Sequence, residues 1–144
     1  MQLTLMALAG LTLIAAAIND LRSLRIPNYL VGILATLAII NALWVGSWNA
    51  LGWIGALGAL IVGLVLWKMG SMGAGDVKLA SACLLWLPGR VIEFLFLMAI
   101  FGGVLAIVYI VAGRVKKKKF DQIPYGVPLA VAALFILTWN VIKT

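Results

Sequence analysis

The chain has 144 residues, of which 65% are hydrophobic and only 10% charged. Soluble domains carry about a quarter charged residues, so this composition excludes a soluble globular protein and indicates one membrane-embedded domain over residues 1–144. The net charge of +7 comes from basic residues that stand between apolar runs, which is typical of membrane topology and not of a nucleic-acid-binding surface. Histidine is absent and Cys83 is the one cysteine. This excludes disulfides, the usual zinc ligand sets and His-dependent nucleophiles, so we expect no metal or cofactor and read Cys83 as a packing residue.

Six apolar segments follow one another along the chain, and we expect each to form a transmembrane helix. A spanning helix needs about 20 apolar residues. The uncharged stretch 26–67 is too long for one helix and contains a turn signal at 46–49, so it divides into two. No basic residue precedes the first run, so we expect that run to be retained and not cleaved as a signal peptide. The expected spans are about 3–19, 28–45, 50–67, 73–87, 91–112 and 124–142. The predicted fold class is therefore all-α, a polytopic membrane protein with six transmembrane helices and no soluble domain.

The fourth segment is the shortest. Only nine residues, 79–87, lie between Lys78 and the break at residues 88–90. As a helix they cover roughly 14 Å, about half of the hydrocarbon thickness. The helix approaches spanning length only if it begins near Gly73, which places Asp76 in its first turn.

The basic residues predict the orientation of the six spans. If the N-terminus is outside, the outer face receives only Arg90 and Lys143, whereas the inner face receives nine basic residues. Since positive residues are retained in the cytoplasm, we expect the N-terminus outside. Five tryptophans fall near the outer ends of the spans, where we expect interfacial anchoring. The nine inner basic residues are Arg22, Arg25, Lys68, Lys78, Arg114, Lys116, Lys117, Lys118 and Lys119, and the five outer tryptophans are Trp44, Trp48, Trp53, Trp86 and Trp139.

Only four residues are acidic: Asp20, Asp76, Glu93 and Asp121. Asp20 ends the first span and Asp76 begins the fourth, so the two spans between them bring both to the same membrane boundary. An acid at membrane depth is costly and is by default a functional candidate with a partner. Lys78 lies roughly 200° around the helix from Asp76, so the expected partner is Asp20. We expect Glu93 to be interfacial and Asp121 to be solvated or to approach the pair.

Two neighbouring carboxyl groups that share a proton have the chemistry of an aspartic protease. One group activates a water molecule that attacks a peptide carbonyl, and the other donates a hydrogen bond to the developing oxyanion. Two other classes remain open on the residues alone. Asp20 and Asp76 could form the proton or cation site of a transporter, or the chain could be a non-catalytic assembly factor.

Three motifs carry a resemblance to a known family. "GAGD" at 73–76 matches the G-x-G-D signature of membrane aspartic proteases, with Ala74 where relatives often have a third glycine. "DLRSLRIPN" at 20–28, "GAGDVKLA" at 73–80 and "IPYGVPLA" at 123–130 resemble, in order and spacing, segments of the type IV prepilin peptidase family. The presenilin and signal-peptide-peptidase type fits less well, because there the first aspartate follows a tyrosine inside a span, and here Asn19 precedes Asp20.

The resemblance implies that Asp20 and Asp76 are catalytic and that the substrate is a prepilin. Cleavage is then expected after a leader glycine, with an acidic residue early in the mature pilin that Lys78, Arg22 or Arg25 could contact. The long bifunctional form of the family has paired cysteines and also N-methylates. This chain has no CxxC motif and looks like the short Flp/Tad-type form, a peptidase only, in the bacterial inner membrane with its site facing the cytoplasm.

Further residues receive supporting roles. Gly73 and Gly75 leave space beside Asp76 for a substrate backbone, or they permit tight helix packing. Pro124 and Pro128 are expected to leave carbonyl groups unpaired, and this segment either braces the substrate or is an ordinary helix start. The lysines at 116–119 predict contact with anionic lipids, and the pilus assembly machinery is a possible partner. The expected substrate-binding and supporting residues are Gly73, Gly75, Lys78, Pro124, Tyr125 and Gly126.

Overall fold

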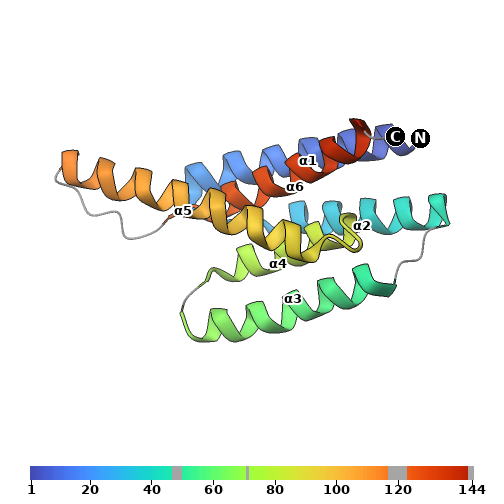
Figure 1. The fold of residues 1–144 in the computed structure, drawn as a ribbon, viewed down its shortest axis with the longest axis horizontal. Helices are drawn as coiled ribbons and strands as arrows, with labels where there is room; N and C mark the ends of the chain where they lie inside the picture. Colours follow the sequence, from blue (N-terminus) through green and yellow to red (C-terminus); the bar gives the residue numbers. More distant parts are fainter. Residues whose placement is uncertain (47–49, 71, 117–122, 143–144) are drawn as a thin grey trace.

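The computed structural model describes residues 1–46, 50–70, 72–116 and 123–142, and these residues form six α-helices without any β-strand (Figure 1). This confirms the prediction of an all-α protein. The second helix has the predicted bounds, while the first and fifth continue further, to Ser23 and Lys116. The six helices are α1 (Gln2–Ser23), α2 (Asn28–Val45), α3 (Ala50–Lys68), α4 (Ala74–Trp86), α5 (Val91–Lys116) and α6 (Gly126–Ile142).

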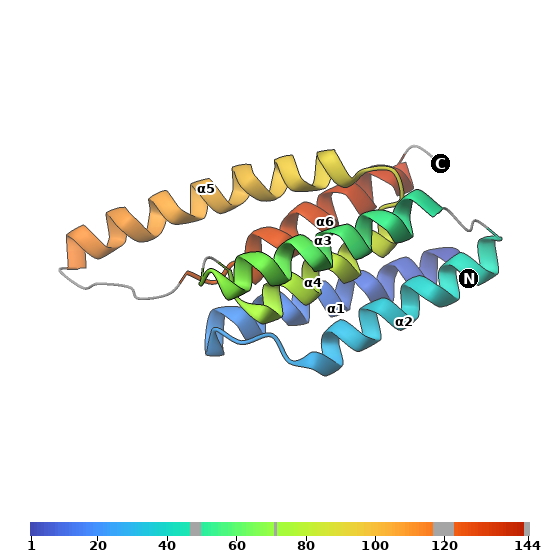
Figure 2. The ribbon, with the colours of Figure 1, turned by 90° about the horizontal axis from the view of Figure 1, so that it is seen from below.

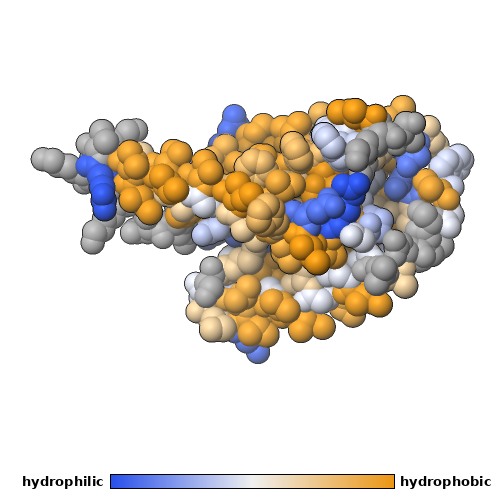
Figure 3. All heavy atoms as spheres, in the orientation of Figure 1, coloured by the Kyte–Doolittle hydropathy of each residue, from blue (hydrophilic) through white to orange (hydrophobic). Residues whose placement is uncertain are grey.

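The helices have the lengths and surfaces of a membrane protein. Within the described residues, three stretches are long and apolar enough to cross a bilayer alone: α1, α2 and residues 91–114 of α5. The apolar stretches 52–68 of α3 and 126–139 of α6 are shorter. Large hydrophobic side chains cover most of the face seen in Figure 3, interrupted by a few hydrophilic patches. A surface of this kind suits contact with lipid, since a soluble protein rarely exposes large apolar patches.

Helix α4 is the centre of the bundle and packs against α3, α2 and α6 (Figure 1). It has 13 residues, about 20 Å at 1.5 Å per residue, so it is too short to cross the hydrocarbon core alone. Val77 lies against α3 where Gly63 has no side chain, which lets the two helices approach closely. Cys83 is fully buried in this core, which confirms its predicted packing role.

The expectation that Trp86 anchors at the outer interface is wrong. Trp86 is only 6% exposed, and its indole Nε1 donates a hydrogen bond of 2.9 Å to the carbonyl oxygen of Leu34 in α2. The side chain therefore joins α4 to α2 inside the protein. The indole N–H of a tryptophan near a span end can donate to a buried carbonyl oxygen as well as to the polar groups of the membrane interface.

The alternation of helix directions brings five helix ends to one end of the bundle. Helices α1 and α3 end there, and α2, α4 and α6 begin there (Figures 1 and 2). Helix α5 packs mainly against α6 and extends past the other helices at this end. Asp20 and Asp76 thus lie at the same end of the molecule, as the count of spans predicts.

Candidate active site

Asp20 lies in the last turn of α1 and is almost completely buried, with 4% of its surface exposed. The sequence places it at the end of the first span, but α1 continues to Ser23 because two side chains stabilise the chain reversal. Asn19 donates a 2.8 Å hydrogen bond to the carbonyl oxygen of Arg25, and the Ser23 hydroxyl donates one to the carbonyl oxygen of Asn19. The helix then stops at Leu24, whose left-handed φ of 51° turns the chain toward α2.

Asp76 is the third residue of α4 and is partly buried. Its carboxylate interacts with the backbone N–H of Gly73, the residue that caps the same helix. An acidic side chain at this position reaches back to a free N–H of its own first turn, which also suits the positive end of the helix dipole. A Cβ on Gly73 would stand 2.8 Å from Oδ2 of Asp76, so glycine makes room for the carboxylate. The structure thus confirms the predicted start of the helix near Gly73.

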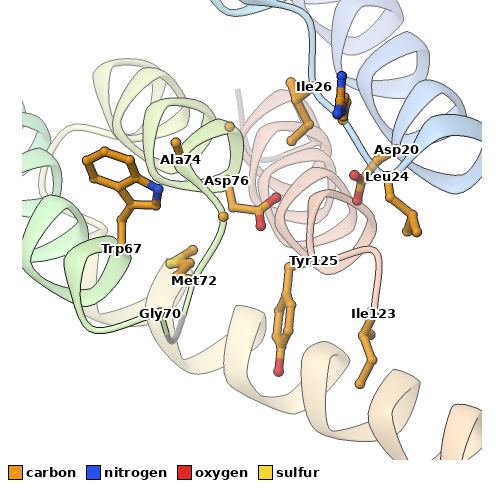
Figure 4. Close-up of a pocket in the computed structure, with 13 residues that line it drawn as sticks. Asp20, Leu24, Ile26, Trp67, Gly70, Met72, Ala74, Asp76, Ile123 and Tyr125 are labelled. Atoms are coloured by element: carbon orange, nitrogen blue, oxygen red, sulfur yellow. The ribbon is translucent and has the colours of Figure 1, made fainter. Parts of the chain in front are cut away.

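The two aspartates line one pocket of about 700 Å³ (Figure 4). Their side chains point toward one another from α1 and α4, and Tyr125 lies beside the gap between them. The two carboxyl groups are close enough to interact electrostatically. Two carboxyl groups that face one pocket are the residue types that carboxylate-catalysed hydrolysis of a peptide bond uses. The pocket lining is completed by Leu24, Arg25, Ile26, Trp67, Gly70, Met72, Gly73, Ala74, Gly75 and Ile123.

The start of α6 holds Asp20 in place. The backbone N–H of Gly126 donates a buried hydrogen bond of 2.7 Å to Oδ2 of Asp20, although 106 residues separate the two. The first N–H groups of a helix have no partner within the helix, so this donor is available to an acid. The predicted role of Gly126 was support of the substrate, whereas the contact observed here is with Asp20.

Ile26 lies where the three sequence motifs meet. It is 9% exposed and packs between the starts of α4 and α6. A Cβ on Gly75 would stand 3.2 Å from the Ile26 Cβ, and a Cβ on Gly126 would stand 2.9 Å from its Cδ1. Gly75 was expected either to leave space for a substrate backbone or to permit tight packing. The structure shows close packing of Gly75 against Ile26. Ile26 is not among the residues predicted for the site, although it stands six residues after Asp20 in the "DLRSLRIPN" motif, which was the available signal.

The basic residues near the aspartates differ in their contacts. Arg25 lines the pocket, and Lys78 does not. The Nζ of Lys78 donates a 3.1 Å hydrogen bond to the side chain of Asn28, outside the pocket, as expected from its position opposite Asp76. Arg22 is exposed and is not among the pocket residues. The sequence leaves these three residues as alternatives, and of the three Arg25 lines the pocket.

The proline segment before α6 is more regular than the sequence predicts. The carbonyl oxygens of Pro124 and Tyr125 accept backbone hydrogen bonds of 3.3 Å from Val127 and Leu129. The carbonyl groups of Pro124 and Tyr125 are therefore paired, contrary to the expectation, because the first turn of α6 supplies partners even though Pro128 lacks an N–H. The carbonyl group that the missing N–H of Pro124 would leave unpaired lies outside the described residues. Tyr125 still lines the pocket and is 38% exposed.

Some candidates lie elsewhere or outside the described residues. Glu93 is in the first turn of α5, which begins at the opposite end of the bundle (Figure 1), and it pairs with Arg90 at 2.9 Å, in keeping with an interfacial role. Asp121 and the lysines at 117–119 fall outside the part of the chain that the structure describes. Trp67 and Met72 line the pocket and were missed, although Trp67 is the one tryptophan at an inner span end. Within the described residues, no group of three Asp, Glu, His or Cys side chains could hold a metal ion.

Comparison with known proteins identifies the family. Residues 7–111 match the model of the type IV leader peptidase family (Peptidase_A24), which covers both aspartates. The chain belongs to this family. The match makes it a membrane protein with a leader-peptidase-like function and leaves residues 123–130 outside the matched region. Searches of curated proteins and of solved structures each found no match.

Proposed function

We propose that this leader peptidase is an aspartic endopeptidase that removes the leader from type IV prepilins of the Flp/Tad kind, with Asp20 and Asp76 as its catalytic residues. The observation that carries the proposal is the meeting of two carboxyl groups from α1 and α4 in one pocket. The family match supports the peptidase activity.

In the proposed mechanism the two aspartates share one proton. The ionised carboxylate removes a proton from a water molecule held between the two groups, and the resulting hydroxide adds to the scissile carbonyl carbon. The protonated carboxyl donates to the carbonyl oxygen as negative charge develops there. The proton taken from water then passes to the leaving amine as the C–N bond breaks. Neither a metal ion nor a covalent intermediate takes part.

The pocket suits an extended peptide at the end of the bundle. A helical segment keeps its carbonyl groups in hydrogen bonds, so the scissile bond must be in extended chain. A volume of about 700 Å³ is within the usual range for ligand sites, and Trp67, Met72 and Ile123 add apolar contacts. The aspartates lie at the helix ends flanked by Arg22, Arg25, Lys68 and Lys78, which supports a site facing the cytoplasm of a bacterial inner membrane, with the N-terminus outside.

Arg25 is the proposed contact for the acidic residue early in the mature pilin. Among the described residues it is the cation that lines the pocket, whereas Lys78 binds Asn28 and Arg22 is outside. An arginine binds a carboxylate through two parallel N–H groups, which adds geometric selectivity to the charge. We further propose that the protein lacks methyltransferase activity, contacts anionic lipids through its basic residues, and acts beside a pilus assembly machinery.

The test is cleavage of an Flp-type prepilin co-expressed in a host that lacks its own prepilin peptidase. The wild type is expected to yield the shortened pilin, and Asp20→Asn and Asp76→Asn are each expected to yield none. Glu93→Gln is the matched control, because this acid lies at the other end of the bundle. Normal processing by either aspartate variant would refute the mechanism. Flux of protons that depends on both aspartates, without any cleavage, would favour a transporter instead.

A further inference from the structure

The contact between Gly126 and Asp20 is the most specific long-range interaction of the site. It joins the first N–H of α6 to a carboxylate in the last turn of α1, and both residues are buried. A buried carboxylate without a partner is costly, so the N–H of Gly126 stabilises Asp20 in the position where Figure 4 shows it.

A side chain at residue 126 would disturb this contact directly. A Cβ there would stand 2.8 Å from Oδ2 and 3.0 Å from Cγ of Asp20, and 2.9 Å from Cδ1 of Ile26. Real Cβ contacts are almost never shorter than 3.0 Å. Either the start of α6 moves away or the carboxyl group of Asp20 turns, and each change alters the position of the acid.

We propose that Gly126 is a positioning residue that orients Asp20 from the backbone of α6, an inference that rests on the proposed peptidase function. Its N–H holds Oδ2, which leaves Oδ1 as the oxygen that faces the attacking water. Gly126 therefore acts on the rate of the chemical step. This role replaces the expected contact with the substrate, which would act on substrate binding.

The first test compares Gly126→Ala with two other glycine variants in purified protein, by kinetics of prepilin cleavage. Misplacement of a reacting group by about 1 Å costs about 100-fold in rate, so kcat of Gly126→Ala should fall by about that factor with KM nearly unchanged. Gly55→Ala is the packing control, since its Cβ would stand 2.7 Å from Cγ2 of Val91, where α3 and α5 begin at the opposite end of the bundle. It should lower the melting temperature and leave kcat of the folded protein unchanged. Gly103→Ala is the neutral control, because open space surrounds that position.

A second variant separates orientation of Asp20 from packing. Ile26→Val removes the Cδ1 atom that a Cβ at residue 126 would meet, so the double variant Gly126→Ala, Ile26→Val relieves that contact alone. We expect it to recover the melting temperature lost in Gly126→Ala and to leave kcat low. Recovery of kcat together with stability would mean that Gly126 serves packing only, and a raised KM with normal kcat would restore the substrate-contact role.

The hydrogen bond itself is observable by NMR of ¹⁵N-glycine-labelled protein in detergent, without any substrate. Asp20→Ala should move the amide proton signal of Gly126 more than that of any other glycine, whereas Asp76→Ala should move that of Gly73. A Gly126 signal unchanged by Asp20→Ala would overturn the inference. If the wild type cleaves prepilin but Gly126→Ala is equally fast, only this inference fails. If the wild type cleaves no prepilin, the proposed function fails and the positioning role with it.

Discussion

The two aspartates have the same kind of partner, yet they acquire it in different ways. In each case Oδ2 lies 2.8 Å from the place where a Cβ would stand on a glycine, Gly126 for Asp20 and Gly73 for Asp76. Gly73 is three residues from Asp76 in the same helical turn, whereas Gly126 is 106 residues from Asp20. One acid is therefore positioned by local sequence, and the other by the packing of α6 against α1.

This difference has a physical consequence for each acid. Asp76 is partly exposed and can turn within the pocket if its local partner changes. Asp20 is 4% exposed, with Ile26 packed close to the same glycine, so it has little space to adjust. We therefore expect the Asp20 side of the site to be rigid and the Asp76 side to tolerate substitution of its neighbouring glycine.

The largest expected effect is loss of kcat on substitution of either aspartate, and it should be the same for both. Because one must be the base and the other the acid, Asp20→Asn and Asp76→Asn should each lower kcat by about a thousandfold or more. The side-chain oxygen of asparagine can still accept a hydrogen bond from the N–H of Gly126 or Gly73, so both variants should fold. The melting temperature in detergent checks this. Cleavage kinetics by gel shift of the pilin give the rate. A variant that loses activity together with its folded structure would not support the mechanism, so both measurements are made on the same preparation.

The next prediction separates the two sides of the site. Gly126→Ala should cost about 100-fold in kcat and Gly73→Ala only about tenfold, because a rigid acid is displaced further from its productive position than one that can turn back. Both variants are compared in the same cleavage assay, with Gly103→Ala as the unaffected control. Equal losses would show that burial of Asp20 does not limit its adjustment, and the contrast between the two acids would be wrong.

The surroundings of Asp76, which are encoded locally, can be predicted from the sequence more completely than those of Asp20. The length of the apolar run between Lys78 and residue 88 placed the start of α4 near Gly73, and counting spans placed Asp20 at the same end as Asp76. The sequence did not indicate that the N–H of Gly126 binds Asp20, because no pattern specifies which helix start meets which helix end. The same limit applies to Trp86, whose place near a span end favoured the interface although tertiary packing buries it.

A third prediction compares the cations beside the two acids. Arg25 lines the pocket near Asp20, and Lys78 binds Asn28 outside it. Loss of a hydrogen bond between charged groups costs about 1.5 kcal/mol or more, so Arg25→Gln should raise KM about tenfold for a prepilin with its early acidic residue. Lys78→Gln should change KM less than twofold, because an exposed charge outside the pocket contributes little to binding. A prepilin whose acid is replaced by glutamine checks the assignment, since it should be cleaved with the same KM by the wild type and by Arg25→Gln.

The smallest expected effect tests the contact that joins the two sides. Ile26 packs between Gly75 and Gly126, so a change at Gly75 can reach Asp20 only by moving Ile26. A Cβ on Gly75 would stand 3.2 Å from the Ile26 Cβ, a tight contact that a shift of a few tenths of an ångström relieves. Gly75→Ala should therefore lower kcat only about twofold and unfolding free energy by about 1 kcal/mol, the low end for an overpacked position. Ala74→Gly is its neighbouring control and should leave kcat unchanged, since it removes a side chain without creating a contact. If Gly75→Ala instead raised KM strongly at normal kcat, this glycine would be where the substrate backbone approaches Asp76, and Ile26 would not couple the two acids.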